Sequence, residues 1–295
     1  MRSEPMIATF TIAARDPATQ TYAVLTASNF LAVGALVPWI DARGGIVVTQ
    51  SFAHPESAAL ALENLRHDTP LKRVLESFLE DDPIAKKRQV GLMNRHGECM
   101  LYDGPDCTPA IESMQGENFF VCGNMLVGGT IEAMAKAYTD ALRHGLELGD
   151  AMLRAMLAGQ QHGGDYRGKL AAAMLMKRPG AGYMGSSDTL VDLRVDASAH
   201  PLAELRDLYS LFKLYNPHHF DHSMIPEAQL SPADNKLLAS LLALLKHSDQ
   251  IPHEPEQVLE LLERHNLAGN YDINKQRFSS LLFSEGHALL RLLRV

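Results

Sequence analysis

The sequence predicts an α+β protein whose antiparallel sheets are covered by pairs of helices, followed by a small all-helical appendage. Segments in which apolar and polar residues alternate occur in groups, and segments with helical periodicity occur in pairs between these groups. The last part of the chain carries only leucine-rich patterns of helical spacing. Because strands neighbour strands and helices neighbour helices, we expect antiparallel sheets.

The first strands open the chain. The segment from Met6 to Arg15 alternates in side-chain type, and Thr21 to Ser28 resumes a β-rich pattern after the turn residues around Pro17. These two segments predict a hairpin. A third strand is expected over Gly45 to Ser51, directly after a glycine-rich turn.

Helical and extended segments then follow in blocks. Two helices are expected between His54 and Leu79, and two more over Thr130–His144 and Glu147–His162. Further strands are expected over Gln89–Met93, Glu98–Tyr102, Asn118–Cys122, Leu170–Met176 and Leu190–Val195. Neither a G-x-G-x-x-G motif opening a helix nor a phosphate-binding loop occurs, which argues against a nucleotide-binding fold.

The domain organisation follows from a change of pattern near Tyr215. We expect a sandwich domain over 1–215 that ends with a helix over Pro201–Tyr215, and a linker over 216–230 rich in proline and histidine. A helical domain is expected over 231–295, with helices over Pro232–His247, Glu254–His265 and Asn274–Arg294.

Composition restricts the class of partner. The net charge of −8 argues against nucleic-acid binding, which needs clustered Lys and Arg, so we expect a small-molecule partner. Three cysteines without C-x-x-C spacing fit a reducing compartment, and the polar first residues do not resemble a signal peptide. No apolar run reaches the roughly 20 residues of a membrane helix. We therefore expect a cytoplasmic protein without membrane contact.

Several short motifs, in their order and spacing, resemble a bacterial family known as domain of unknown function ten-twenty-eight. The similarity covers about residues 6–215. The family is grouped with the N-terminal-nucleophile hydrolases. The motifs are Thr9 to Pro17, Ala27-Ser28 with Ala32-Val33-Gly34, Val48-Thr49-Gln50, Gly123-Asn124-Met125-Leu126, Gly163 to Gly168, and Val191 to Asp196.

This resemblance implies a four-layer αββα sandwich, two antiparallel sheets face to face between two helical layers. In active members of the superfamily, a Thr, Ser or Cys at the start of the first strand attacks an amide, and its own α-amino group is the base. The matching residue here is Thr9. Because an amide nitrogen is not basic, this chemistry requires that the Ala8-Thr9 bond be cut.

The resemblance further implies catalytic residues Thr9, Ser28, Gly123 and Asn124. Each has a structural alternative. Thr9 is also an ordinary β-branched strand residue, and Ser28 fits a strand-end hydroxyl bonded to backbone. Gly123-Asn124 fits a turn as well as an oxyanion site, in which an amide and a backbone N–H stabilise developing charge.

The expected substrate-binding residues are Arg15, Asp16, Gln50, Asp165 and Arg167. Asp165 and Arg167 fit an internal ion network better than a clamp on a substrate carboxylate or amine. His218, His219, Asp221 and His222 have metal-ligand side chains, but they lie in a linker without a second cluster, so we expect no metal site. No cofactor is expected.

Two hypotheses of function remain. The leading one is a hydrolase acting on a small amide or another C–N bond, with Thr9 as nucleophile after processing. The alternative is a non-catalytic scaffold that binds a metabolite or supports assembly. The leucine stripes of the tail normally face the protein's own core or a second subunit, which leaves homo-oligomerisation open.

Overall fold

The computed structural model describes residues 9–245 and 254–293, which form two compact units. The first unit ends at Leu205 and the second begins at Arg206, inside the helix α5, Pro201–Tyr215. The sequence placed this boundary at 215, where the helical pattern stops. Because α5 is continuous, its pattern cannot reveal that the contacts change along its length. No described helix is long and apolar enough to cross a membrane.

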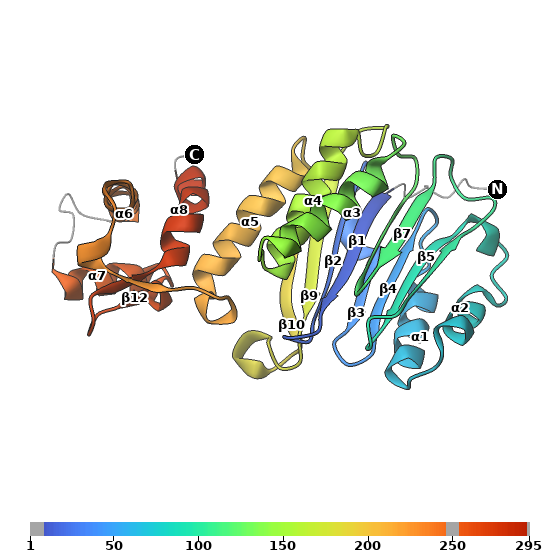
Figure 1. Ribbon diagram of the computed structural model, residues 1–295, viewed down its shortest axis with the longest axis horizontal. Helices are drawn as coiled ribbons and strands as arrows, with labels where there is room; N and C mark the ends of the chain where they lie inside the picture. The colour runs from blue at the N-terminus through green and yellow to red at the C-terminus, as the bar shows by residue number, and fades with distance from the viewer. Residues whose placement is uncertain (1–8, 246–253, 294–295) are drawn as a thin grey trace. The chain divides into compact units, whose positions relative to one another are not determined.

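A six-stranded antiparallel sheet is the larger of the two sheets in the first unit (Figure 1). Its strand order is β10-β9-β2-β1-β8-β7. The predicted hairpin is present, and the predicted strand start at Met6 lies outside the described residues. The strand β7 was not predicted, because its sequence ESMQG has no apolar alternation and is extended through pairing with β8. The bounds are β1 Thr9–Asp16, β2 Thr21–Ser28, β7 Glu112–Gly116, β8 Phe119–Gly123, β9 Ala171–Lys177 and β10 Thr189–Val195.

A four-stranded antiparallel sheet faces the first one, with the order β3-β4-β5-β6. Its strand β3 was missed because it is four residues long and begins with a proline, which is tolerated at the start of an edge strand. Apolar side chains from both sheets, including Val24, Ile46 and Phe120, form one buried cluster between them. The bounds are β3 Pro38–Asp41, β4 Gly45–Gln50, β5 Gln89–Asn94 and β6 Cys99–Asp103.

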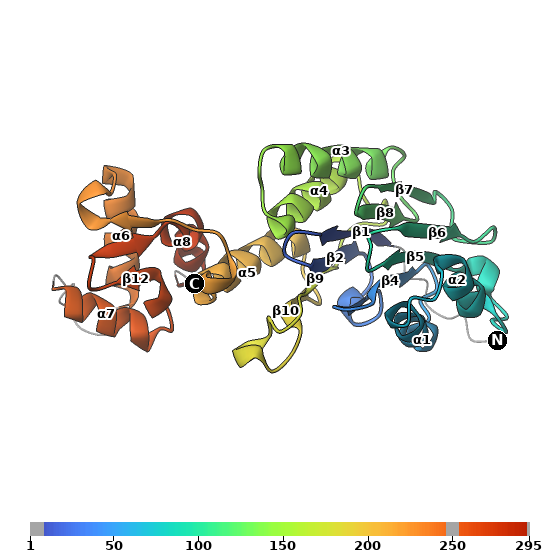
Figure 2. The ribbon, with the colours of Figure 1, turned by 60° about the horizontal axis from the view of Figure 1, so that its bottom comes forward.

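Helices cover the outer faces of the two sheets, as Figure 2 shows. The helices α1, Pro55–Arg66, and α2, Leu71–Leu79, pack on the four-stranded sheet through residues such as Leu65 and Phe78. The helices α3, Thr130–Arg143, and α4, Leu148–His162, pack on the six-stranded sheet. The prediction of a mixed α+β protein with antiparallel sheets is therefore confirmed.

The second unit is not all helical, so that prediction is wrong. A three-stranded sheet of order β11-β13-β12 accompanies its helices. Strands of two or three residues are too short to show a period of two. The helix expected from Asn274 begins at Ser280, because the preceding residues pair as β13, and the predicted linker contains β11. The predicted helix ends at His247 and Arg294 lie outside the described residues.

The elements of this unit are α6 Pro232–Leu245, α7 Pro255–Arg264, α8 Ser280–Leu293, β11 Met224–Pro226, β12 Tyr271–Asp272 and β13 Arg277–Ser279. Short 3₁₀ turns complete the chain at η1 Val33–Ala35, η2 Ala85–Lys87, η3 Tyr183–Gly185, η4 Pro217–His219, η5 Glu227–Gln229 and η6 Ala268–Asn270.

Candidate functional site

The four residues predicted to be catalytic lie together where β1 begins. Thr9 is the first residue of β1 and pairs directly with Ser28, the last residue of β2. The backbone N–H of Asn124 donates to the carbonyl oxygen of Thr9 at 3.0 Å. A Cβ atom at Gly123 would lie 2.9 Å from that same oxygen, so this close approach requires glycine. Thr9 and Ser28 are 0% and 1% exposed.

A chain of buried neutral side chains crosses between the two sheets next to this group. Thr11, two residues after Thr9 on the same face of β1, donates from its hydroxyl to Gln50 Oε1 at 2.8 Å. Its Oγ1 also lies 2.9 Å from that of Thr26 on β2. Gln50 Nε2 in turn donates to Gln89 Oε1 at 2.8 Å. The interface between the two sheets is therefore polar near Thr9, whereas most of this interface is apolar.

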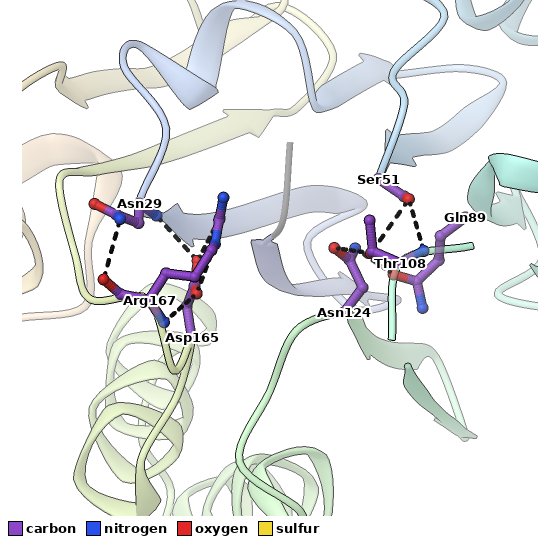
Figure 3. Close-up of polar contacts among 7 residues, drawn as sticks. All are labelled: Asn29, Ser51, Gln89, Thr108, Asn124, Asp165 and Arg167. Carbon is purple, nitrogen blue, oxygen red and sulfur yellow. Dashed lines mark hydrogen bonds and ion pairs between the residues drawn. The ribbon is translucent and has the colours of Figure 1, made fainter. Parts of the chain in front are cut away.

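Gln89 connects this chain to Asn124. Asn124 Nδ2 donates to Gln89 Oε1 at 3.0 Å, and the Thr108 hydroxyl donates to Asn124 Oδ1 at 2.8 Å (Figure 3). Ser51 Oγ lies 3.4 Å from Thr108 Oγ1. We call the seven side chains of Thr11, Thr26, Gln50, Ser51, Gln89, Thr108 and Asn124 the amide network. All of them are buried, with exposed fractions of 5% or less.

The direction of the central hydrogen bonds in the amide network is fixed at Gln89. Its Nε2 donates to the backbone carbonyl of Gly123 at 3.2 Å and to Asp103 Oδ1 at 2.8 Å. A backbone carbonyl can only accept, so Gln89 Oε1 must point toward the amide groups of Gln50 and Asn124. Both of these then donate to Gln89 and present their own oxygens to threonine hydroxyls. Only one orientation of the three side-chain amides therefore gives every one of these hydrogen bonds both a donor and an acceptor.

Two residues that directly follow amides of this network have backbone conformations unusual for their type. Ser51 has φ of 67° and follows Gln50, and Met125 has φ of 55° and follows Asn124. Residues other than glycine adopt this left-handed region at a cost of about 1–3 kcal/mol, and they cluster at functional sites. Their position directly after two network amides marks this end of the sheets as a candidate site.

An ionic cluster lies at the end of β2. Arg167 donates to the Asp165 carboxylate in a bidentate pair, from Nε to Oδ1 at 3.1 Å and from the guanidinium NH2 to Oδ2 at 2.7 Å. The backbone N–H of Asn29 also donates to Asp165 Oδ2 at 3.2 Å, and its side chain donates to the Arg167 carbonyl oxygen at 3.1 Å (Figure 3). The Asp165 side chain is fully buried, and that of Arg167 is 24% exposed.

The family of unknown function DUF1028 matches residues 9–205, starting at Thr9. The chain belongs to the DUF1028 family. A crystal structure of protein SPO2555 from Silicibacter pomeroyi, also assigned to DUF1028, superposes with a TM-score of 0.63 and 25% identity, over 70% of this chain and 86% of that one.

Other comparisons are weaker. Anbu, the ancestral beta-subunit from Yersinia bercovieri, aligns with a TM-score of 0.30 and 11% identity, over 72% of this chain and 98% of that one. No curated protein matches the chain. Membership of DUF1028 is thus confirmed, and it leaves the reaction open.

Two further predicted residues of the DUF1028 unit lie away from Thr9. Arg15 and Asp16 occupy the opposite end of β1, roughly 20 Å away at about 3.3 Å per strand residue. Arg15 donates to Asn118 Oδ1 at 3.3 Å and lies over the Tyr22 ring. Asp16 accepts from the Ala18 N–H at 2.9 Å within the hairpin turn. The structure does not bring these two residues to the amide network.

The cysteines of the unit are free thiols. Burial raises the pKa of Cys99 to about 12 and raises the pKa of Cys122 well above its usual value. These thiols therefore stay protonated at neutral pH and are poor nucleophiles. Within the described residues, no group of three or more His, Cys, Asp and Glu side chains is arranged to hold a metal ion.

Sequence reasoning missed Gln89, Thr108, Ser51 and Thr26. Gln89 lies 39 positions from Gln50 and 35 from Asn124, so no local motif connects them. The available signal was polarity at strand ends, since Gln50 and Gln89 are large polar residues at the limits of mostly apolar strands. Their direct pairing follows from the register of β4 and β5.

Proposed function

We propose that this DUF1028 unit is a four-layer αββα hydrolase of the N-terminal-nucleophile type, which cleaves a small amide or another C–N bond. Thr9 is the nucleophile, and it becomes active once the chain is cut between Ala8 and Thr9. We place this activity in the cytoplasm, consistent with the free thiols.

The observation that carries this proposal is the amide network beside the first residue of β1. Burying amides and hydroxyls between sheets costs free energy unless every group is bonded, and an apolar core would avoid that demand. Here the polar groups occupy the end of the interface near Thr9, and two residues there have left-handed conformations, Ser51 within the network and Met125 next to Asn124. Such a combination is typical of a site that positions reacting groups.

The chemistry assigned to Thr9 balances as follows. After cleavage of the Ala8-Thr9 bond, the free α-amine has an ordinary pKa of about 7.7–8.0 and accepts the hydroxyl proton. Thr9 Oγ1 forms a bond to the substrate carbonyl carbon, and the C–N bond then breaks as the leaving amine takes that proton. Water attacks the resulting ester, releases the acid and restores the hydroxyl group.

The neighbouring residues receive supporting roles. An amide NH2 group has two donor hydrogens, and the bond to Gln89 uses one of those on Asn124, so the other is assigned to the oxyanion. Ser28, directly opposite Thr9, orients its hydroxyl. Gln50 positions the network, because its amide bonds to Thr11 and Gln89. The partly exposed Arg167, held by Asp165, binds a substrate carboxylate.

The test is intact-mass analysis with N-terminal sequencing, followed by a panel of small amides. The expected result is a chain that begins at Thr9 and hydrolyses a panel member. Thr9→Ala should lower kcat by about 1000-fold or more, and Asn124→Ala by about 100-fold or more. Thr21→Ala is the matched control, since Thr21 is a buried threonine at the opposite end of the hairpin, and it should keep full activity.

The burial of Thr9 and of the network amides favours a second function. Thr9 is 0% exposed, and the three network amides bond to one another. An uncut chain has no amine at Thr9, and it would act as a metabolite-binding or assembly scaffold. A uniformly uncut chain that hydrolyses no amide of the panel would contradict the hydrolase and favour this alternative.

A further inference from the structure

The outer edge of β10 has features that suit pairing with another strand. β10 is the last strand of the six-stranded sheet, and no described strand lies on its outer side. Residues Val191 to Val195 pair in regular register with β9 on the inner side. An exposed strand edge offers unpaired backbone N–H and C=O groups, which is a template for a further strand.

Two charges of opposite sign stand two residues apart on this strand. Asp192 and Arg194 lie on the same face, and Arg194 Nε donates to Asp192 Oδ1 at 2.9 Å. Both side chains reach the solvent, with exposed fractions of 39% for Arg194 and 41% for Asp192. An exposed pair of this kind contributes little to stability within one chain, so exchanging this partner for one on another chain costs little.

This arrangement is self-complementary under a two-fold axis. If two β10 strands pair antiparallel with Leu193 opposite Leu193, then Asp192 of each copy faces Arg194 of the other. Val191 of each copy then faces Val195 of the other. Within Val191 to Val195, every opposed pair is therefore of opposite charge or apolar, and both charge pairs stay on one face of the sheet.

The loop before β10 supplies a second observation. Tyr183 and Met184 are 85% and 87% exposed, the highest values among the exposed large apolar residues of the described chain. The loop is ordered by hydrogen bonds such as Gly182 N–H to the Ser187 carbonyl at 2.8 Å and Gly180 N–H to Asp188 Oδ1 at 2.9 Å. An ordered loop that presents two large apolar side chains to solvent is typical of a contact surface.

We propose that the β10 edge is a homodimer interface, through which two copies of this chain join their six-stranded sheets. Each copy also contributes Tyr183 and Met184, which reach past the paired strands toward the segment that follows β10 in the other copy. The remaining edge strands of the two larger sheets, β3, β6 and β7, each carry acidic charge only. Self-pairing through them would oppose like charges or leave charges unmatched, which favours β10.

The test is the mass of the full chain in solution, by analytical ultracentrifugation, for a charge-swap series. Wild type is expected to sediment as a dimer. Asp192→Arg and Arg194→Asp, each alone, oppose like charges and should halve the mass. The double variant restores opposite charges and should restore the dimer. Circular dichroism of each variant checks that the chain is folded, and the restored double variant shows that the positions tolerate both residues.

A second variant tests the loop. Tyr183→Ser with Met184→Ser should weaken dimerisation about 10-fold or more, because it removes apolar contact area. Leu60→Ser, at a half-exposed position on α1, is the matched control and should leave the dimer unchanged. A wild-type chain that is monomeric at all concentrations would overturn the proposal. So would a dimer that survives both single charge swaps, or a double variant that remains monomeric.

Discussion

Arg88 and Gln89 are neighbours in the chain, yet they belong to buried clusters of opposite kinds. Arg88 forms a bidentate ion pair with Asp82, from Nε at 2.8 Å and from NH2 at 3.1 Å, and also donates to the carbonyl oxygens of Phe52 and Ala53. Both charged side chains are at most 6% exposed. Gln89 is 0% exposed and bonds only to neutral amides, carbonyls and the Asp103 carboxylate.

The difference shows what each cluster can do. The ion pair ties the segment before α1 to the start of β5, and its strength depends on charge, so it depends on pH. The amide network contains no titratable member and has a single satisfied orientation, so the hydrogen bonds that hold its hydroxyls do not depend on a charged member. Only the second property suits a site that must hold a nucleophile in place, and only the second cluster lies next to Thr9.

The largest expected effect is at the ion pair. Arg88→Ala should lower the free energy of unfolding by about 3–5 kcal/mol, because it leaves the Asp82 charge buried without a partner. Denaturation with urea measures this. Arg73→Ala, which removes an exposed pair with Glu76, is the control and should cost less than about 1 kcal/mol. Equal losses in the two variants would contradict the distinction between buried and exposed pairs.

Gln89→Leu should follow, with a loss of about 2–4 kcal/mol in the same assay. The substitution keeps a similar volume but leaves the donors of Gln50 and Asn124 without their acceptor. Gln115→Leu, at an exposed position of β7, should change stability by less than about 0.5 kcal/mol. A stable Gln89→Leu protein would mean that the network amides find other partners.

Thr11→Val should cost about 1–2 kcal/mol, since it removes one hydroxyl and leaves Gln50 Oε1 without its donor. The matched Thr21→Val lies at the other end of the hairpin and should cost less. Combining Thr11→Val with Thr26→Val tests the hydroxyl pair as a double-mutant cycle. If the two losses simply add, the contact between these hydroxyls contributes no coupling.

The smallest expected effect is the dependence of stability on acid. Burial alone would raise the pKa of Asp82, but the hydrogen bonds from Arg88 and the Ile84 N–H, with the Arg88 charge, lower it below 3.8. The stabilisation is therefore present above the unfolded-state pKa and is lost as pH falls through the lower folded-state value. Urea denaturation at a series of acidic pH values should show that the free energy of unfolding of the wild type falls with pH. The Asp82→Asn variant should lack this part of the fall.

The sequence by itself determined the elements whose patterns are local. The β1–β2 hairpin follows from alternation around a turn at Pro17, and α1 to α4 follow from apolar residues at helical spacing. The motifs at Thr9 and at Gly123-Asn124 identified the DUF1028 family and grouped residues that do lie together. The direct pairing of Thr9 with Ser28 required only the hairpin register.

Tertiary structure decided the rest. Gln89 becomes the centre of the amide network because β5 pairs with β4 and faces β8, two contacts that depend on register rather than on any nearby residue. β7 is extended because it pairs with β8, the next strand along the chain, and β11 is extended because it pairs with β13, which lies far along the sequence. Local periodicity encodes the shape of an element, whereas the partners of a buried polar group depend on which elements meet, and that is settled by packing of the whole chain.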